Sequence, residues 1–267
     1  MTDDYAQDFD LIRETAREAG KLALTYWGRP IQKQRKADGT EVTEADHAVD
    51  ALLAARLKGA RPGYGWLSEE SADHEGRLHA RRVWIADPID GTRAFLQGLD
   101  DWVIALALIE DGAPILAAVV NPVRNETYEA HIGQGAFLSG RGLTASAKSE
   151  LEGAKLVVAR NILKPDRWAR DSKFGPWPPV KTVWANSMIY RFALVASGKA
   201  DSVFATKPKW EWDVAAGALL VSEAGGIVTD PCGLPLKFNS NEAKVPGFLA
   251  AAPNLHHILA GRMGEAS

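Results

Sequence analysis

The chain has 267 residues, of which 46% are hydrophobic and 24% are charged, and its formal net charge is −3. This balance is typical of a globular protein, and the length corresponds to one large domain or two closely packed ones. We expect no nucleic-acid polymer as a partner, because binding one needs a basic surface.

The sequence also predicts a cytoplasmic protein without a membrane partner. Cys232 is the only cysteine, so no internal disulfide can form, which is typical of a reducing compartment. The acidic start, Met-Thr-Asp-Asp, lacks the basic and apolar regions of a signal peptide. The longest apolar run, residues 102–109, is far shorter than a bilayer-spanning helix.

The first predicted element in chain order is an amphipathic helix. Hydrophobic residues recur at steps of three and four from Phe9 to Tyr26. Gly28 and Pro30 end this pattern. The charged, glycine-bearing segment that follows, residues 33–40, is predicted to be a loop.

A second helix is predicted directly after residue 43. Thr43 and Asp46 have the spacing of a capping box, with Thr43 at the N-cap and Asp46 as the third helical residue. Apolar residues continue at helical spacing from Val49 to Leu57. Capping alone could therefore account for Asp46.

Carboxylates follow two short apolar runs that we predict to be strands. Residues 64–67 lead into Glu69 and Glu70, and residues 83–86 lead into Asp87. Adjacent glutamates are often only solvated surface charges. Here, however, two strands in succession are predicted to end in acidic side chains.

The stretch from Asp87 to Thr92 carries the clearest indication of chemistry. Pro88 has no N–H for a sheet and is predicted to end the strand directly after Asp87. Asp87 and Asp90 would lie so close that their charges need protons or cations, and hard divalent cations prefer oxygen ligands. Gly91 lets the backbone approach a ligand, and successive amides in such a turn can bind an anion. We interpret the stretch as a metal-assisted phosphate site, although simple turn chemistry would use the same residue types.

The middle of the chain predicts an antiparallel sheet. Residues 102–109 and 115–120 are apolar runs joined by Asp111-Gly112, which is typical of a hairpin. Residues 128–138 predict another hairpin. Because these strands lie between helical segments, the sequence predicts a layered α/β sandwich.

The polar, glycine-bearing segment near residue 145 is where we expect an N-terminal subdomain, residues 1–145, to meet a C-terminal one, residues 146–267. In the second half, residues 186–197 have helical spacing and residues 202–205 form a short apolar strand. Asp213 is predicted to cap the next helix, and an aspartate in that position is often a cap and nothing more.

Three sequence signatures, in order along the chain, resemble those of the inositol monophosphatase family. They are Ser68-Glu69-Glu70-Ser71, the Asp87–Thr92 stretch, and Trp212-Asp213-Val214-Ala215-Ala216-Gly217 with Glu223-Ala224-Gly225-Gly226. Each signature alone is modest evidence for the family, but the ordered set is strong evidence. The resemblance extends from Lys36 to Gly226. It implies an αβαβα layered sandwich of the inositol monophosphatase and fructose-1,6-bisphosphatase type, and a homodimer.

The resemblance also implies a phosphatase that uses two or three Mg²⁺ ions and a metal-activated water. The implied metal ligands are the side chains of Glu69, Asp87, Asp90 and Asp213 and the carbonyl of Ile89. Asp46 and Thr92 would activate the water, and Glu70 is a further catalytic candidate. Lithium inhibition is implied too, although family members differ in it.

The implied substrate is a small phosphorylated metabolite. Its candidate contacts are Gly91, Thr92, Lys36, Lys207, Lys209 and Glu211. The Gly91 and Thr92 amides would hold the phosphate, and Lys36, with Asp38, belongs to a loop that covers the metal site in the family. Surface solvation is an equally good explanation of Lys207 and Lys209.

The identity of the ester is left open. Inositol-specific members have a glutamate where this chain has Thr206, which argues against inositol 1-phosphate. A second phosphate, as in 3'-phosphoadenosine 5'-phosphate, would give Lys207 or Lys209 a partner. Residues 233–239 and Pro246-Gly247-Phe248 also resemble the bisphosphate nucleotidase branch of the family. Residues 36–46 resemble the histidinol-phosphatase branch, so histidinol phosphate is a third candidate.

A non-catalytic member that acts as a binding or regulatory protein is the alternative from another class. The loss of a metal carboxylate would mark such a member, and every expected carboxylate is present in this sequence.

Overall fold

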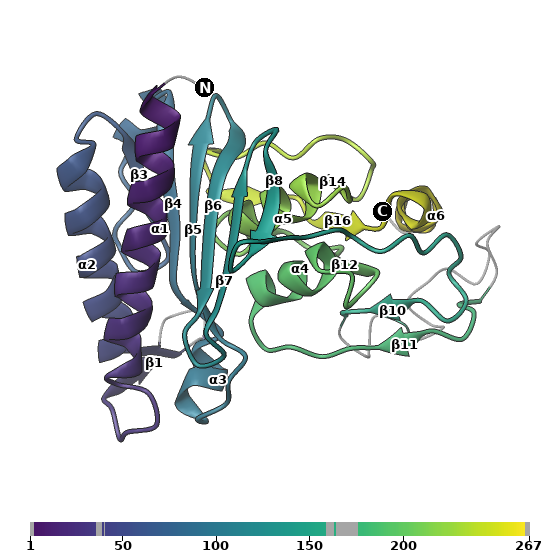
Figure 1. Ribbon diagram of the computed structural model, residues 1–267, viewed down its shortest axis with the longest axis horizontal. Helices are drawn as coiled ribbons and strands as arrows, with labels where there is room; N and C mark the ends of the chain where they lie inside the picture. The colour runs from purple at the N-terminus through teal and green to yellow at the C-terminus, as the bar shows by residue number, and fades with distance from the viewer. Residues whose placement is uncertain (1–2, 36–38, 40, 159–162, 164–175, 265–267) are drawn as a thin grey trace.

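The computed structural model of the chain describes residues 3–35, 39, 41–158, 163 and 176–264. Helices and sheets alternate in five layers (Figure 1). Helices α1 (Asp3–Leu24) and α2 (Glu44–Ala60) cover one face of a seven-stranded sheet. Helices α4 (Met188–Ala196) and α5 (Ala215–Glu223) separate it from a five-stranded sheet, whose far face is covered by α6 (Pro253–Gly264).

The seven-stranded sheet follows chain order from β3 to β9. Its strands are β3 (Gly65–Ser68), β4 (Arg82–Asp90), β5 (Val103–Glu110), β6 (Ala113–Asn121), β7 (Glu126–His131), β8 (Gly135–Leu138) and β9 (Arg141–Gly142). Strands β3 and β4 are parallel, and each later pair is antiparallel. The predicted hairpin at Asp111-Gly112 joins β5 to β6 and the second joins β7 to β8, so both are confirmed.

The five-stranded sheet is mixed and has the order β11-β10-β12-β16-β14. Its strands are β10 (Lys155–Leu156), β11 (Lys181–Thr182), β12 (Ser202–Ala205), β14 (Ile227–Thr229) and β16 (Phe248–Ala251). Two smaller pairs are β1 (Lys33–Arg35) with β2 (Glu41–Thr43), and β13 (Lys209–Trp210) with β15 (Lys244–Val245). Two short helical segments, η1 (Glu75–His79) and α3 (Thr92–Leu96), lie before and after β4.

Strand β5 shows how the sequence builds the layers. Its odd-numbered residues from Val103 to Ile109 pack toward α4 and α5, and its even-numbered residues from Ile104 to Leu108 pack toward α1 and α2. Successive side chains of a strand point to opposite faces, so a strand that is apolar throughout is buried on both. With the third cluster between the second sheet and α6, the predicted αβαβα order is confirmed.

Helices α4 and α5 approach each other closely. A Cβ atom added to Gly217 of α5 would lie only 2.5 Å from the Phe192 ring of α4, so only glycine allows this approach. The Phe192 ring in turn lies 4.6 Å, between centroids, from that of Phe248 on β16. One aromatic side chain therefore links the central helices to the second sheet.

Three predictions of local structure are wrong. Residues 33–35 form strand β1, paired with β2, where a loop was predicted. Strand β4 continues through Pro88 to Asp90, because its pairing with β5 shifts between Asp87 and Asp90 and Pro88 falls within that irregularity. Asp213 does not cap α5, since the helix begins at Ala215 and no side chain caps it.

The division at residues 1–145 and 146–267 stays a prediction. The larger sheet belongs to the first range and the smaller one to the second, but one apolar cluster joins residues of both. None of the helices that the structure describes has the length and apolar character that a membrane-spanning helix needs.

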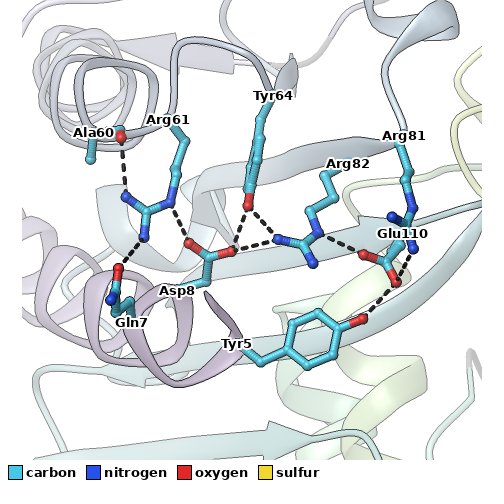
Figure 2. A network of polar contacts seen from close by, with 9 residues as sticks. All are labelled: Tyr5, Gln7, Asp8, Ala60, Arg61, Tyr64, Arg81, Arg82 and Glu110. Carbon is cyan, nitrogen blue, oxygen red and sulfur yellow. Dashed lines mark hydrogen bonds and ion pairs between the residues drawn. The ribbon is translucent and has the colours of Figure 1, made fainter. Parts of the chain in front are cut away.

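A polar network ties α1 to the larger sheet (Figure 2). Asp8 of α1 is completely buried and accepts hydrogen bonds from Arg61 Nε at 2.7 Å and from the Tyr64 hydroxyl at 2.8 Å. Arg82 of β4 contacts Asp8 at 3.4 Å and Glu110 of β5 at 2.6 Å. A buried charge with several partners of this kind is sensitive to the removal of any one of them.

We predict that Asp8→Ala lowers the free energy of unfolding by about 2–4 kcal/mol, because it leaves the guanidinium groups of Arg61 and Arg82 without their shared counter-charge. Asp10→Ala removes an acid from the same helix that is 70% exposed, and should change stability by less than about 0.5 kcal/mol. Urea denaturation followed by circular dichroism measures both. If both variants lost the same free energy of unfolding, the stabilising role of the buried Asp8 would be contradicted.

Candidate active site

A cavity of about 330 Å³ lies where the end of β4 meets α3, α4 and the segment before α5. Its lining residues are Glu41, Glu69, Asp87, Ile89, Asp90, Gly91, Thr92, Arg93, Trp184, Asn186, Arg191 and Asp213. All the implied metal ligands are among them. The acidic side chains among these ligands come from three distant segments of the chain and meet in one wall.

The carboxylate of Asp87 is buried among other acids. Asp87 is 2% exposed, and within the described part of the chain its Oδ1 atom has no hydrogen-bond partner. Burial, followed by the charges of Glu69, Asp90, Asp213 and Asp46, raises the pKa of this carboxyl well above its usual value. A buried oxygen without a partner is costly, and a bound cation would remove both penalties.

The carboxylate of Asp90 is held by the first turn of α4. The hydroxyl of Ser187, the N-cap residue, donates to Oδ2 at 2.6 Å, and the Met188 N–H donates to Oδ1 at 3.0 Å. The Ile189 N–H also donates to Oδ2. Burial raises the pKa of Asp90, while these donors and the charge of Arg191 oppose that rise. Because a helix N-terminus favours negative charge, α4 offsets part of the cost of burying Asp90.

Asp213 reaches the cavity from the segment before α5. Burial, then the charges of Asp90 and Glu69, raise the pKa of Asp213 to about 7, while Lys209 acts in the opposite direction. A cation near this carboxyl would favour its charged form. Burial and neighbouring acids thus raise the pKa of Asp213 as they raise that of Asp87.

The oxygen atoms that line this cavity are suitable ligands for a hard cation. Carboxylate and carbonyl oxygens are the ligands that Mg²⁺ prefers, and the unpartnered Oδ1 of Asp87 faces no competing donor among the described residues. Across the described ranges, no three His, Cys, Asp or Glu side chains are already arranged so that they could hold a metal ion. Both oxygens of Asp90 instead accept hydrogen bonds from α4. The ligand roles of the individual residues therefore stay predictions.

Asp46 serves the start of α2 and also contacts Thr92. Its Oδ2 accepts from the Thr43 N–H at 2.8 Å and from the Thr43 hydroxyl at 2.5 Å, and the predicted capping box is confirmed. The Thr92 hydroxyl lies 3.4 Å from Asp46 Oδ1 and 3.1 Å from the Ile89 carbonyl oxygen. Either oxygen can accept its hydrogen, so capping and the contact with Thr92 occur together.

Gly91 brings the backbone to the cavity wall. Its φ is +98°, a conformation that other residues rarely adopt. A Cβ atom at Gly91 would also lie 3.3 Å from atoms of Asp101, Trp102 and Ser187. The conformation therefore strongly favours glycine at this turn, and the tight space adds to that preference.

Glu211 lies outside the cavity wall that the described residues form. It is completely buried, and its carboxylate accepts hydrogen bonds from the N–H groups of Asn239 and Ser240, at 2.6 and 2.7 Å, and from the Ser240 hydroxyl. These bonds anchor the loop at residues 239–240. The role of Glu211 as a substrate contact stays a prediction.

Three other candidates are not part of the cavity wall that the described residues form. Lys207 is exposed, Lys209 is half-buried and affects Asp213 only through its charge, and Glu70 is half-buried beside Glu69. Lys36 and Asp38 lie outside the described residues.

Sequence reasoning missed five residues of the wall: Glu41, Arg93, Trp184, Asn186 and Arg191. The Arg191 guanidinium lies 4.9 Å from the centroid of the Trp184 ring, and Trp184 is 60% exposed. Burial lowers the pKa of Arg191, against the charges of Asp90 and other nearby acids. An arginine inside an otherwise apolar helical pattern was the available signal for this part of the site.

Comparison with known proteins agrees with this geometry. The family model described as the inositol monophosphatase family matches residues 4–263. A histidinol-phosphatase from Chlorobaculum parvum is 35% identical over 226 residues, which cover 84% of this chain and 85% of that protein. An inositol-1-monophosphatase from Mesorhizobium japonicum is 32% identical over 239 residues, with 83% and 84% covered. The solved structure of an IMPase from Thermotoga maritima is 28% identical with a TM-score of 0.81, covering 98% of this chain and 97% of that one.

The raised pKa of Asp213 predicts how the stability of the chelator-treated protein depends on pH. The folded-state pKa of about 7 exceeds the unfolded value of about 4, so the folded state binds the proton more tightly. The stabilisation from protonated Asp213 is complete below pH 4 and is lost as the pH rises to 7. The free energy of unfolding should fall by up to about 1.4 kcal/mol per pH unit in this range.

Urea denaturation between pH 4.5 and 8 measures that slope, which Asp213→Asn should reduce. Asp111→Asn, at an acid with a 70% exposed side chain, is the control and should keep the slope of the wild type. If the free energy of unfolding changed with pH equally in the wild type and in Asp213→Asn, the raised pKa of Asp213 would be contradicted.

Proposed function

Since the chain belongs to the inositol monophosphatase family and is a phosphomonoesterase, we propose that it hydrolyses a small phosphate ester with the help of Mg²⁺. The observation that carries this proposal is the crowding of carboxylates around Asp87, whose buried Oδ1 has no hydrogen-bond partner among the described residues. Such a site is costly without a cation and is suited to one.

The groups that would hold two or three Mg²⁺ ions are the carboxylates of Glu69, Asp87, Asp90 and Asp213 and the carbonyl of Ile89, all of which line the cavity. When bound, such ions supply a water of lowered pKa and offset the negative charge of the phosphate oxygens. The family depends on metals in general; the ion and the count are part of this proposal.

The chain's own residues would orient the attacking water. The Thr92 hydroxyl is positioned by Asp46 and by the Ile89 carbonyl, and we propose that Asp46 accepts a proton through Thr92. The Gly91 and Thr92 amides would hold the phosphate at the turn that the positive φ of Gly91 creates. Glu70, beside Glu69, stays a catalytic candidate.

Positive charge and an aromatic ring also line the cavity. Arg93, Arg191 and the exposed indole of Trp184 line it. A guanidinium pairs well with a phosphate, and an indole with a flat ring. We therefore favour an ester whose leaving group has a second anionic group and a ring, such as 3'-phosphoadenosine 5'-phosphate. Arg191 takes the place of Lys207 and Lys209 in this proposal.

Histidinol phosphate is the second candidate. The histidinol-phosphatase of Chlorobaculum parvum is 35% identical to this chain. The carboxylate of Glu41 lies in the cavity wall and already binds one cation, Lys33 Nζ, at 2.8 Å, so it could also attract a cationic leaving group. Arg191 would oppose such a cation, which is why we place this substrate second. A homodimer and a cytoplasmic location stay predictions.

We predict that Asp90→Asn abolishes most Mg²⁺-dependent phosphate release while the protein stays folded. The loss should exceed the roughly 10- to 100-fold that removal of a residue behind a metal ligand costs. Phosphate release at several Mg²⁺ concentrations, with circular dichroism as the folding check, measures it, and Asp111→Asn serves as the charge-matched control. Near-normal turnover by Asp90→Asn would refute the assignment.

We predict that Arg191→Met raises KM for 3'-phosphoadenosine 5'-phosphate by about 10- to 100-fold, because it removes a charged hydrogen bond worth about 1.5–3 kcal/mol. The same variant should leave KM for inositol 1-phosphate nearly unchanged and should not weaken the binding of histidinol phosphate. Side-by-side assays of the three esters with both proteins test this. Equal effects on all three would remove Arg191 from substrate selection.

A further inference from the structure

Asp101, in the segment between α3 and β5, is bound to the residues at which α4 begins. Its carboxylate accepts a hydrogen bond from the Asn186 N–H at 2.6 Å and contacts the Asn186 side-chain amide nitrogen at 2.9 and 3.0 Å. Its carbonyl oxygen accepts from the Ser187 N–H at 3.3 Å. Asp101 thus fixes both residues that precede the helix.

The same short segment holds Asp90. The hydroxyl of Ser187 and the N–H groups of Met188 and Ile189 donate to the Asp90 carboxylate. The turn at Gly91 is packed against this junction, since a Cβ atom there would lie 3.3 Å from both the Asp101 carbonyl oxygen and Ser187 Cβ. A displacement of residues 186–187 would therefore move the donors that orient Asp90.

We propose that Asp101 is a positioning residue that sets the cation affinity of the cavity, by fixing the first turn of α4 and thereby the orientation of Asp90. This inference rests on the proposed Mg²⁺ function. A hydrogen-bonding residue behind a metal ligand typically changes metal affinity 10- to 100-fold when it is removed. Asp101 differs from such a residue only in acting through the helix terminus.

The body of α4 does not depend on Asp101. Ile189, Phe192 and Val195 are completely buried in the apolar cluster between the two sheets, and that burial keeps the helix in place. The loss of Asp101 should therefore loosen residues 186–188 and not the fold. This is why a metal-affinity measurement can separate positioning from general stability.

The experiment is a calorimetric titration of the substrate-free, chelator-treated protein with Mn²⁺, which needs no enzymatic turnover. Asp101→Ala should weaken Mn²⁺ binding by about 10-fold or more. Asp101→Asn should recover most of the affinity, because its amide oxygen can still accept the Asn186 N–H. Asp10→Ala, at an exposed acid of α1, should bind as the wild type does.

In phosphate-release assays, Asp101→Ala should need about 10-fold more Mg²⁺ for half-maximal rate, with kcat at saturating Mg²⁺ within a few fold of the wild type. A folded Asp101→Ala variant with unchanged Mn²⁺ affinity would overturn the proposal, as would a loss that Asp101→Asn does not recover. A wild-type protein that binds no Mn²⁺ would overturn the proposed function as well.

If Asp101→Ala does not fold, Asn186→Ala tests the proposal instead. This variant removes only the side-chain hydrogen bonds between Asn186 and Asp101 and keeps the backbone one. A several-fold loss of Mn²⁺ affinity in Asn186→Ala, with an unchanged melting temperature, supports positioning. Wild-type Mn²⁺ affinity in Asn186→Ala would mean that the Asp101–Asn186 contact only stabilises the fold, and would overturn the proposal.

Discussion

Mutual repulsion among the acidic groups of one cavity is the constraint on which the site depends. Asp87 and Asp90 are nearly inaccessible to solvent, and in a medium of low dielectric their charges interact strongly. The chain offsets part of this repulsion with the first turn of α4, which donates to Asp90. Asp87 receives no such compensation at Oδ1 from the described residues. The negative charge that stays uncompensated favours the binding of a cation, and this suits the cavity to a phosphatase.

The layered fold explains how these groups come together. Asp90 lies at the end of β4, its donors lie at the start of α4, and Asp213 lies just before α5. Each of these carboxylates therefore lies at or near the end of an element whose body is packed in the core. Sites built on such ends keep their geometry better than sites on long loops. The central helical layer contributes to the site and to the packing of both sheets at once.

Much of this could be predicted from the sequence, because the signals were local or came in a recognisable order. The capping box at Thr43 and the hairpin at Asp111-Gly112 depend on a few adjacent residues. The hydrogen bonds that hold the buried Glu211 carboxylate could not be predicted, because its partners lie almost thirty residues further along the chain. Arg191 was missed for a related reason: helical spacing shows which residues share a face, but not which of them line a cavity between two layers.

The close approach of Gly217 to Phe192 has a mechanical consequence. Because α4 and α5 touch through an aromatic ring and a bare backbone, they resist sliding or hinging apart, as close-packed interiors generally do. Asp90, held by α4, and Asp213, ahead of α5, therefore belong to one rigid block. We expect ligands to enter and leave through rearrangements of mouth residues such as Trp184, and not by the parting of the two halves of the molecule.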